Sequence, residues 1–332
     1  MVFPMTIYDI ASALNISPST VSRVANNKSG VRRETRQLVL KYMEEHNYVP
    51  NITARNLVNQ STKIIGILIA DVRTAYHAES VYHIQRELNN LGYCCIIFNT
   101  GSDDTAKAEH MQILSQRRVE AVVLIGSTFQ CDLVEQAIQR HLRDTPVFLF
   151  NGHLDLPNVY SIMADEQNGV TNCVRFLAQK GRKHPAFLLN AHTPSNDLKQ
   201  FGYEIGVRSY LQMEPLVYEV QEDTPQGGYE ATLRLMQEHP ETDSLIYSVD
   251  LLAVSGLRAL SDLNIRVPDQ VSVMGVDNSM YAQISIPRLT SLDNKLLDMS
   301  MTTARMLIDA LSGKPTTRNI MILSDIQERE ST

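Results

Sequence analysis

Apolar residues follow two different periods along this chain. Through residue 46 they recur at helical spacing, whereas from residue 64 onward short continuous apolar runs alternate with helical stretches. Alternation of this kind is typical of parallel sheets buried under helices on both faces. The pattern therefore predicts a small all-α head and a large α/β body, with strands over 64–70, 94–98, 120–126, 146–150, 186–189, 244–248 and 271–276.

The body is long enough for two lobes. We expect one Rossmann-like, parallel-sheet subdomain over about 63–162 with a return near 293–323, and a second over 163–290. Ligands of open α/β sheets bind beyond the carboxyl ends of the strands, here in a cleft between the lobes. We expect Asp277 to contact the ligand and Asp250 to cap the helix over 251–260. The polar residues that follow the strands suit the hydroxyls of a carbohydrate; they are Asp71, Arg73, Ser127, Asn151, Asp250, Asp277 and Asn278.

The head begins with two short helices around a tight turn. Thr6 and Asp9 have the spacing of a capping box, which predicts a helix from Ile7. Asn15 tolerates left-handed geometry, and Ser17-Pro18 supplies a second N-cap followed by proline at the first helical position.

The second helix separates apolar from polar side chains. Val21, Val24 and Ala25 share the face that we expect to be buried. An arginine pairs with guanine and an asparagine with adenine in the major groove, so the opposite face predicts DNA reading rather than an ordinary solvated surface. This face carries Ser19, Ser22, Arg23 and Asn26, with Thr20 at its border.

A third helix is predicted over 34–46. Its apolar positions are Leu38, Val39, Tyr42 and Met43. The residues at its front can reach phosphates; they are Arg32, Arg33, Thr35 and Arg36.

Charge is unevenly spread over the 332 residues. The net charge is −7, yet residues 1–62 hold seven lysines and arginines against four acids. A basic head on an acidic body indicates a polyanionic partner for the head, because its cations displace phosphate counterions.

Other functional classes find little support. The four cysteines lack metal-ligand spacing and indicate reduced core thiols; neither a signal peptide nor a long apolar run is present, so a cytoplasmic protein is expected. Catalytic, nucleotide-binding and metalloprotease motifs are absent, so we expect no enzyme, no cofactor and no metal.

Two motifs carry a family resemblance. The stretches TIYDIASALNISPSTVSRVANN and VRRETRQLVLKYMEEHNYVPNITARNLV resemble the LacI/GalR family of transcriptional regulators, and the likeness continues to residue 331. It implies a helix-turn-helix head over 1–49, a hinge helix over 50–62 and a periplasmic-binding-protein-like body over 63–332. It also implies a homodimeric repressor of a sugar-utilisation operon, which binds a palindromic DNA operator and responds to a small carbohydrate-like effector.

The resemblance assigns DNA contacts. The base-reading positions are Pro18, Ser19 and Arg23, and since proline has no side-chain donor we expect Arg23 to dominate, with Ser19 and Asn26 secondary. Leu57 occupies the position that wedges into the minor groove, although it could instead pack on the body. The remaining expected DNA contacts are Thr6, Tyr8, Ser17, Thr20, Ser22, Thr35, Asn51 and Ala54.

The resemblance also assigns an effector site. Lys199 stands where the family usually has arginine, and Val249 where many members have asparagine, which leaves the effector class open. Alternatives are a catabolite-control regulator with a phosphocarrier protein as corepressor, a purine- or nucleoside-responsive regulator and, more weakly, an enzyme on the same scaffold. The expected effector-binding residues are Arg73, Tyr76, His77, Ser127, Asn151, Lys199, Asp277 and Asn294.

Overall fold

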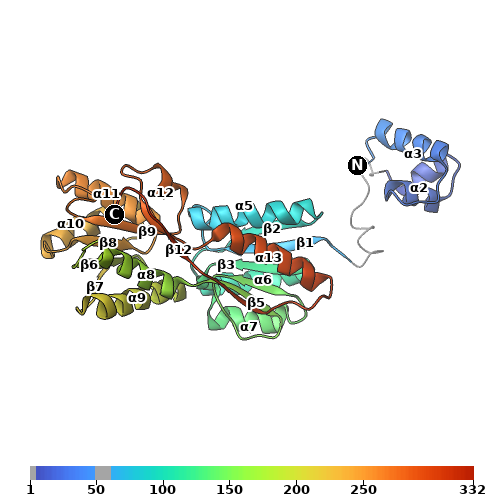
Figure 1. The fold of residues 1–332 in the computed structure, drawn as a ribbon. Helices are drawn as coiled ribbons and strands as arrows, with labels where there is room; N and C mark the ends of the chain where they lie inside the picture. The colour runs from blue at the N-terminus through green and yellow to red at the C-terminus, as the bar shows by residue number, and fades with distance from the viewer. Residues whose placement is uncertain (1–4, 49–60) are drawn as a thin grey trace. The chain divides into compact units, whose positions relative to one another are not determined.

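The computed structural model describes residues 5–48 and 61–332 (Figure 1). Two compact units are present, Met1–Thr62 and Lys63–Thr332. The first contains the helical head and the second the α/β body. No helix of the described residues is long and apolar enough to cross a membrane.

The head consists of α1 (Ile7–Ala13), α2 (Pro18–Ala25) and α3 (Arg33–Glu45). The predicted capping box is confirmed: Thr6 N donates to Asp9 Oδ2 over 2.7 Å, and Asp9 N donates to Thr6 Oγ1 over 3.3 Å. Asn15 has φ of 53°, and the Ser17 side chain accepts from Thr20 N ahead of Pro18. Local capping chemistry therefore sets where both helices of the turn begin.

Six buried side chains form the core of the head, namely Ile10, Ala11, Val21, Val24, Val39 and Met43. The prediction that Leu38 belongs to this core is wrong, because its side chain is 50% exposed. Val39 and Met43 lie one turn apart and face α1 and α2, whereas Leu38 is rotated about 100° away from them. Four apolar residues in two adjacent pairs make a stripe too broad for a head with only two other helices to cover.

Arg36 ties the front of α3 to the loop after α2. Its guanidinium donates to Asn27 Oδ1 over 3.0 Å and to the Lys28 carbonyl. This arginine therefore holds the loop in place, whereas the sequence suggested a phosphate contact.

The body contains two six-stranded sheets, as expected for its α/β class. The first has the order β11-β5-β4-β3-β1-β2 and is parallel throughout. Its strands are β1 (Ile64–Ile69), β2 (Cys94–Asn99), β3 (Ala121–Ile125), β4 (Val147–Phe150), β5 (Val159–Ala164) and β11 (Asn319–Ile322).

The second sheet has the order β12-β10-β9-β8-β6-β7, and only its β10–β12 pair is antiparallel. Its strands are β6 (Pro185–Leu189), β7 (Leu216–Glu219), β8 (Ser244–Tyr247), β9 (Ser272–Val276), β10 (Thr290–Asp293) and β12 (Asp325–Gln327).

All seven predicted strands are confirmed, and five others escaped the pattern. β7, β11 and β12 are only partly buried, so they lack a continuous apolar run, and β5 alternates buried with half-buried positions. β10 is buried but reads Thr-Ser-Leu-Asp. Its polar side chains are satisfied by tertiary hydrogen bonds that the sequence does not reveal.

Helices cover both faces of each sheet (Figure 1). In the first lobe, α5 (Ala75–Asn90) and α13 (Leu296–Leu311) cover one face, and α6 (Asp104–Gln116) and α7 (Asp132–His141) the other. The helices of the second lobe are α8 (Glu166–Gln179), α9 (Pro194–Gly206), α10 (Pro225–Glu238), α11 (Asp250–Asp262) and α12 (Met280–Ile284).

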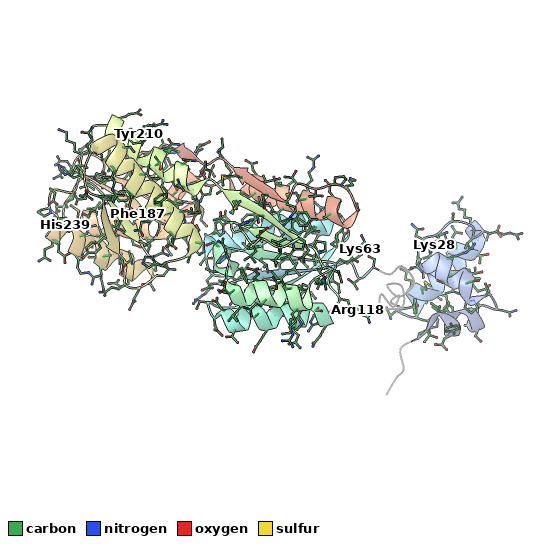
Figure 2. The ribbon with its side chains drawn as sticks, turned by 90° about the horizontal axis from the view of Figure 1, so that it is seen from below. Lys28, Lys63, Arg118, Phe187, Tyr210 and His239 are labelled. Atoms are coloured by element: carbon green, nitrogen blue, oxygen red, sulfur yellow. The ribbon has the colours of Figure 1, made fainter. Side chains whose placement is uncertain are left out.

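The second lobe has its own core. Figure 2 shows Phe187 inside it, where the fully buried ring stacks on Tyr203 with 5.4 Å between centroids. Each lobe is thus a three-layer unit.

The chain passes between the lobes three times, after β5, β10 and β11. These passages bring Glu166, Asn294 and Ser324 together, although they are far apart in sequence. Ser324 Oγ donates to Asn294 Oδ1 over 2.9 Å, and Asn294 Nδ2 donates to Glu166 Oε1 over 3.2 Å. A hydrogen-bonded chain therefore links the passages.

The cysteines are free, as expected, but the prediction that all are core thiols is wrong. Cys94 is exposed, Cys95 and Cys131 are half-buried, and Cys173 is buried. Cys94 lies on β2, and this strand forms the edge of its sheet, where one side has no covering neighbour.

The head core should be sensitive at one apolar position and tolerant at another. We expect Ile10→Ala to lower the unfolding free energy of the head by about 2 to 4 kcal/mol, because it leaves a cavity. Leu38→Ala, at a half-exposed position, should cost less than about 1 kcal/mol. Hydrogen exchange of α1–α3 amides in the full chain measures both, and equal losses would contradict the assignment of the core.

Candidate DNA-reading face and effector cavity

The polar face of α2 is open to solvent. Val21 and Val24 are buried, as predicted, while Ser19 and Arg23 are exposed and Ser22 is half-buried. The other expected DNA contacts in the described part of the head are also accessible: Thr6, Tyr8 and Ser17 are exposed, and Pro18, Thr20, Asn26 and Thr35 are half-buried.

Hydrogen bonds within the head distinguish these side chains. The Ser17 hydroxyl contacts those of Ser19 and Thr20, each over 2.8 Å. The Asn26 amide donates to the Ser22 carbonyl over 2.8 Å, and Asn26 is the C-cap of α2. Among the described residues, no hydrogen bond or ion pair engages Arg23. Its guanidinium is therefore the cationic donor on this face that remains available to a partner.

Three expected DNA contacts, Asn51, Ala54 and Leu57, lie outside the described residues.

The body contains a cavity of about 460 Å³ at the carboxyl ends of its strands. This volume lies in the range typical of small-molecule sites. The first lobe contributes residues of the loop before α5 and of the turn Ser127–Phe129. The second lobe contributes the starts of α8, α9, α10 and α11 and the loop after β9.

Seven of the eight expected effector residues line this cavity: Arg73, Tyr76, His77, Ser127, Asn151, Lys199 and Asp277. Asn294 lies behind the wall, almost fully buried, where its amide donates to Glu166 and Asp277. The sequence reasoning did not find the lining residues Glu166 and Asp223, because they follow or end strands β5 and β7, which lack a continuous apolar run. Asn190, Ser195 and Tyr281 carried no local signal.

A buried carboxylate forms the centre of the cavity wall. Glu166, 2% exposed at the start of α8, accepts from Asn151 Nδ2 over 3.3 Å and from Asn294 Nδ2 over 3.2 Å. Lys199 Nζ lies 3.4 Å from the same oxygen. Glu166 therefore joins groups from both lobes.

The Lys199 ammonium is fully occupied. Besides Glu166, it donates to Asn196 Oδ1 and to the Ser248 carbonyl, each over 3.2 Å. An ammonium has three N–H donors, and all three have acceptors here. Burial works against the charged form, but the carboxylates of Glu166 and Asp277 outweigh it and raise the pKa of Lys199.

The prediction that Asp250 caps α11 is wrong. The N-cap is Val249, without a side-chain cap, and Asp250 is the first helical residue. Its carboxylate accepts from Ser279 N over 2.6 Å, from Ser279 Oγ over 2.8 Å and from Ser291 Oγ over 2.6 Å. Burial, together with repulsion from Asp277, raises the pKa of Asp250 to about 7. Asp250 thus fastens α11 to β10 and to the loop after β9.

Asp277 presents a carboxylate to the cavity from left-handed backbone, with φ of 101°, followed by Asn278 with φ of 50°. It accepts one long hydrogen bond, 3.4 Å from Asn294 Nδ2. Burial raises the pKa of Asp277 to about 6 against the opposing attraction of Lys199, and Glu166 adds repulsion.

Tyr76 supplies an aromatic surface. Its ring lies 6.0 Å from that of Phe150 and 5.8 Å from that of His77. The Tyr76 hydroxyl is buried, and no described residue forms a hydrogen bond with it. A buried hydroxyl without a partner carries a free-energy cost that a ligand can relieve.

The neighbouring loop residues are tied down. Arg73 Nε and Nη2 donate to the two oxygens of Asp71 over 3.0 and 2.6 Å, and Arg73 lowers the pKa of Asp71 to about 2. His77 Nδ1 lies 2.6 Å from Thr74 Oγ1 and 2.9 Å from the Asp71 carbonyl. Burial lowers the pKa of His77, which favours a neutral ring.

Two further hydrogen bonds cross between the lobes beside the cavity. Ser195 N, at the start of α9, donates to Ser127 Oγ over 3.1 Å. Asn151 Nδ2 donates to Ser195 Oγ over 3.5 Å. The lobes therefore meet through groups that also line the ligand site.

A helix-turn-helix head joined to a bilobed body with a polar cavity defines a ligand-responsive DNA-binding protein. Residues 6–51 match the model of bacterial regulatory proteins of the lacI family, and residues 174–332 match that of the periplasmic binding protein-like domain. The chain belongs to the lacI family of bacterial regulatory proteins and is a transcriptional regulator, not an enzyme.

Full-length relatives agree with this assignment. The chain is 29% identical to an HTH-type transcriptional regulator of Lachnoclostridium phytofermentans, over 99% of both chains. It is 25% identical to the ribose operon repressor of Halalkalibacterium halodurans, over 93% of this chain and 91% of the relative. A solved lac repressor dimer bound to operator and the anti-inducer ONPF has the same fold, with TM-score 0.90 and 22% identity over 99% of both chains.

Metal chemistry has no visible site in the parts that the structure describes: no group of three or more His, Cys, Asp or Glu side chains there could hold an ion.

The raised pKa of Asp277 makes a stability prediction. Its folded-state pKa of about 6 exceeds the model value of 3.8, so ionisation destabilises the fold above that pKa, and protonation relieves the cost as the pH falls toward 4. We expect Asp277→Asn to raise the unfolding free energy of the body by about 2 kcal/mol near pH 8, with the gain shrinking below about pH 6.

Chemical denaturation of the full chain across this pH range measures the effect. Asp155→Asn removes a carboxylate that is 96% exposed and should show no such pH-dependent gain. A pH-independent difference at Asp277 would contradict the assignment.

Proposed function

We propose that this regulator is a repressor of a sugar-utilisation operon that binds a palindromic operator as a homodimer in the cytoplasm, and that a small polyhydroxylated effector controls it through the body cavity. One observation carries the proposal. The same chain combines an unengaged arginine on the exposed face of α2 with a polar, partly aromatic cavity between two lobes.

Arg23 is the principal base-reading residue in this proposal. Guanidinium groups pair with guanine O6 and N7 in the major groove, and Arg23 needs to break no internal contact to do so. Ser19 is the secondary reader, whereas the Asn26 amide is already bonded to the Ser22 carbonyl. Thr6, Tyr8, Ser17, Thr20, Ser22 and Thr35 would position the head on phosphates. Pro18 would make only apolar contacts, and Asn51, Ala54 and Leu57 would act in the hinge over 50–62.

The cavity suits a ligand rich in hydroxyls. Carboxylates and amides from both lobes offer acceptors and donors, and the Tyr76 ring offers a surface for the apolar face of a sugar. The name of the ribose operon repressor among the relatives agrees with a sugar effector. Asp277 is the main anchor in this proposal, with Tyr76, His77, Ser127, Asn151 and Arg73 around it. Lys199 and Asn294 support the wall.

A homodimer accounts for exposed apolar side chains on the body. Met280 and Ile284 on α12 are more than half exposed, and Ile286, which follows, is 94% exposed. Apolar residues grouped in this way are costly in water unless a partner covers them. The lac repressor named among the structural neighbours is described as a dimer.

The phosphocarrier alternative has less support. The exposed side of α13 contains Leu297, Asp298, Met301 and Arg305, so Arg305 is its one cation. A phosphorylated partner favours a cluster of cations.

Control of DNA binding follows from the lobe contacts. An effector that prefers one arrangement of the Ser127, Asn151 and Ser195 bridge shifts the relative populations of the lobe arrangements. If only one of these arrangements supports the hinge, the effector changes operator affinity by the same coupling free energy.

The DNA assignment is tested with Arg23→Ala. Against the operator that the wild-type chain enriches from random duplexes, we expect a loss of about 1 to 3 kcal/mol and relaxed discrimination at one base pair. Lys41→Ala removes the same charge from α3 and should weaken all sequences about equally. Gel-shift titrations of both variants decide the matter, and unchanged discrimination in Arg23→Ala would refute the assignment.

Effector control is tested by reciprocity. A sugar that raises the melting temperature of the full chain should change operator affinity about 5- to 150-fold, and operator should change sugar affinity by the same factor. Titrations of each ligand with and without the other measure this coupling. Sugar binding that leaves operator affinity unchanged would contradict the proposed control.

A further inference from the structure

The cavity has an excess of negative charge. Five carboxylates line it, from Asp71, Glu166, Asp223, Asp250 and Asp277, against two fixed cations, Arg73 and Lys199. Charges in a partly enclosed cavity interact more strongly than in water, because the surrounding protein screens them less. The balance of charge therefore bears on what the cavity accepts.

Neither cation is available to an anionic ligand. All three donors of Lys199 are directed at Glu166, Asn196 and the Ser248 carbonyl. Arg73 grips both oxygens of Asp71, and its side chain is 87% exposed to solvent at the mouth. A carboxylate or phosphate ligand would have to break one of these ion pairs to gain a cationic partner.

The helix starts around the cavity do not compensate. Amide ends of helices attract anions, but the side chain of Thr193 caps α9 by accepting from Asn196 N, and that of Thr224 caps α10 by accepting from Gly227 N. The first turn of α11 contains Asp250 itself. Local groups already answer these three positive ends.

Asp277 is the acid with the fewest partners. Its one hydrogen bond, from Asn294, is 3.4 Å long, whereas Asp250 has three short ones and Glu166 an ion pair. Glu166 and Glu79 repel its charge, and Lys199, shared with Glu166, attracts it. A desolvated carboxylate in this position gains most from a new cation.

We propose that the effector is a polyhydroxylated molecule carrying a protonated amine, such as an amino sugar, that its ammonium binds the Asp277 carboxylate, and that the cavity rejects anionic sugars. This inference rests on the proposed function, since it specifies the charge of the ligand at that site. The proposed ligand donates hydrogen to the carboxylate acceptors and leaves the Lys199–Glu166 pair intact.

The test is calorimetric titration of the full chain with matched sugars. Glucose, galactose and mannose are each tried as the neutral sugar, the 2-amino sugar, and the 6-phosphate. We expect the amine of any skeleton that fits to bind about tenfold or more tightly than its neutral form, and the phosphate not to bind.

The outcomes separate the two proposals. Binding of a neutral or phosphorylated member as tight as that of its amine overturns the present inference and leaves sugar control standing. Absence of binding by every member rejects the amino-sugar assignment, and the sugar-control proposal fails with it only if the neutral sugars also leave operator affinity unchanged.

Two further measurements connect the preference to Asp277. Asp277→Asn should remove the preference for the amine, whereas Asp155→Asn, which changes net charge equally on the surface, should retain it. In the wild-type chain near pH 6, amine binding should release protons from the cavity, because the ammonium favours the ionised carboxylate. Titrations in two buffers of different ionisation enthalpy report this release, and its absence overturns the proposal even if the variant does not fold.

Discussion

The buried ion pair between Glu166 and Lys199 is the constraint on which the body depends. Glu166 begins α8 directly after the first passage between the lobes, and it accepts hydrogen bonds from Asn151 of the first lobe and from Asn294 of the second passage. An unpaired charge at 2% exposure would be strongly destabilising, so the pair and its amide partners must form together. Ligand site and lobe contact thereby become one network, in which a molecule that changes the electrostatics of the cavity also acts on the connection between the lobes.

The head follows a different logic, because it is small. Six buried side chains hold three helices, and local caps at Thr6 and Ser17 set the helix starts. A core of this size leaves most of α2 uncovered, so Arg23 stays available while Arg36 is used to fasten the loop after α2. The scarcity of buried area is thus what makes the face of α2 accessible to DNA.

Lysine in place of arginine at position 199 acquires a definite meaning in the folded chain. An arginine has five donors in a planar fork and could serve both Glu166 and a ligand, whereas the three donors of Lys199 are all used internally. The substitution moves the ligand contact toward the carboxylates, with Asp277 the least satisfied of them.

Sequence alone determined what depends on neighbours along the chain. The capping box, the proline-started α2, its valine face and the seven strands with continuous apolar runs all follow from local periodicity and capping chemistry. Strand ends also located Asp71, Ser127, Asn151 and Asp277, since parallel strands present their carboxyl ends at one edge. Tertiary structure alone decided the rest. Leu38 is exposed because only two other helices are available to cover α3, and Asp250 binds two serines far along the chain instead of capping α11. Glu166 meets Asn294 across 128 positions. Such contacts depend on which lobe passages lie side by side, and that arrangement is set by the packing of whole sheets, which leaves no periodic trace in the residues concerned.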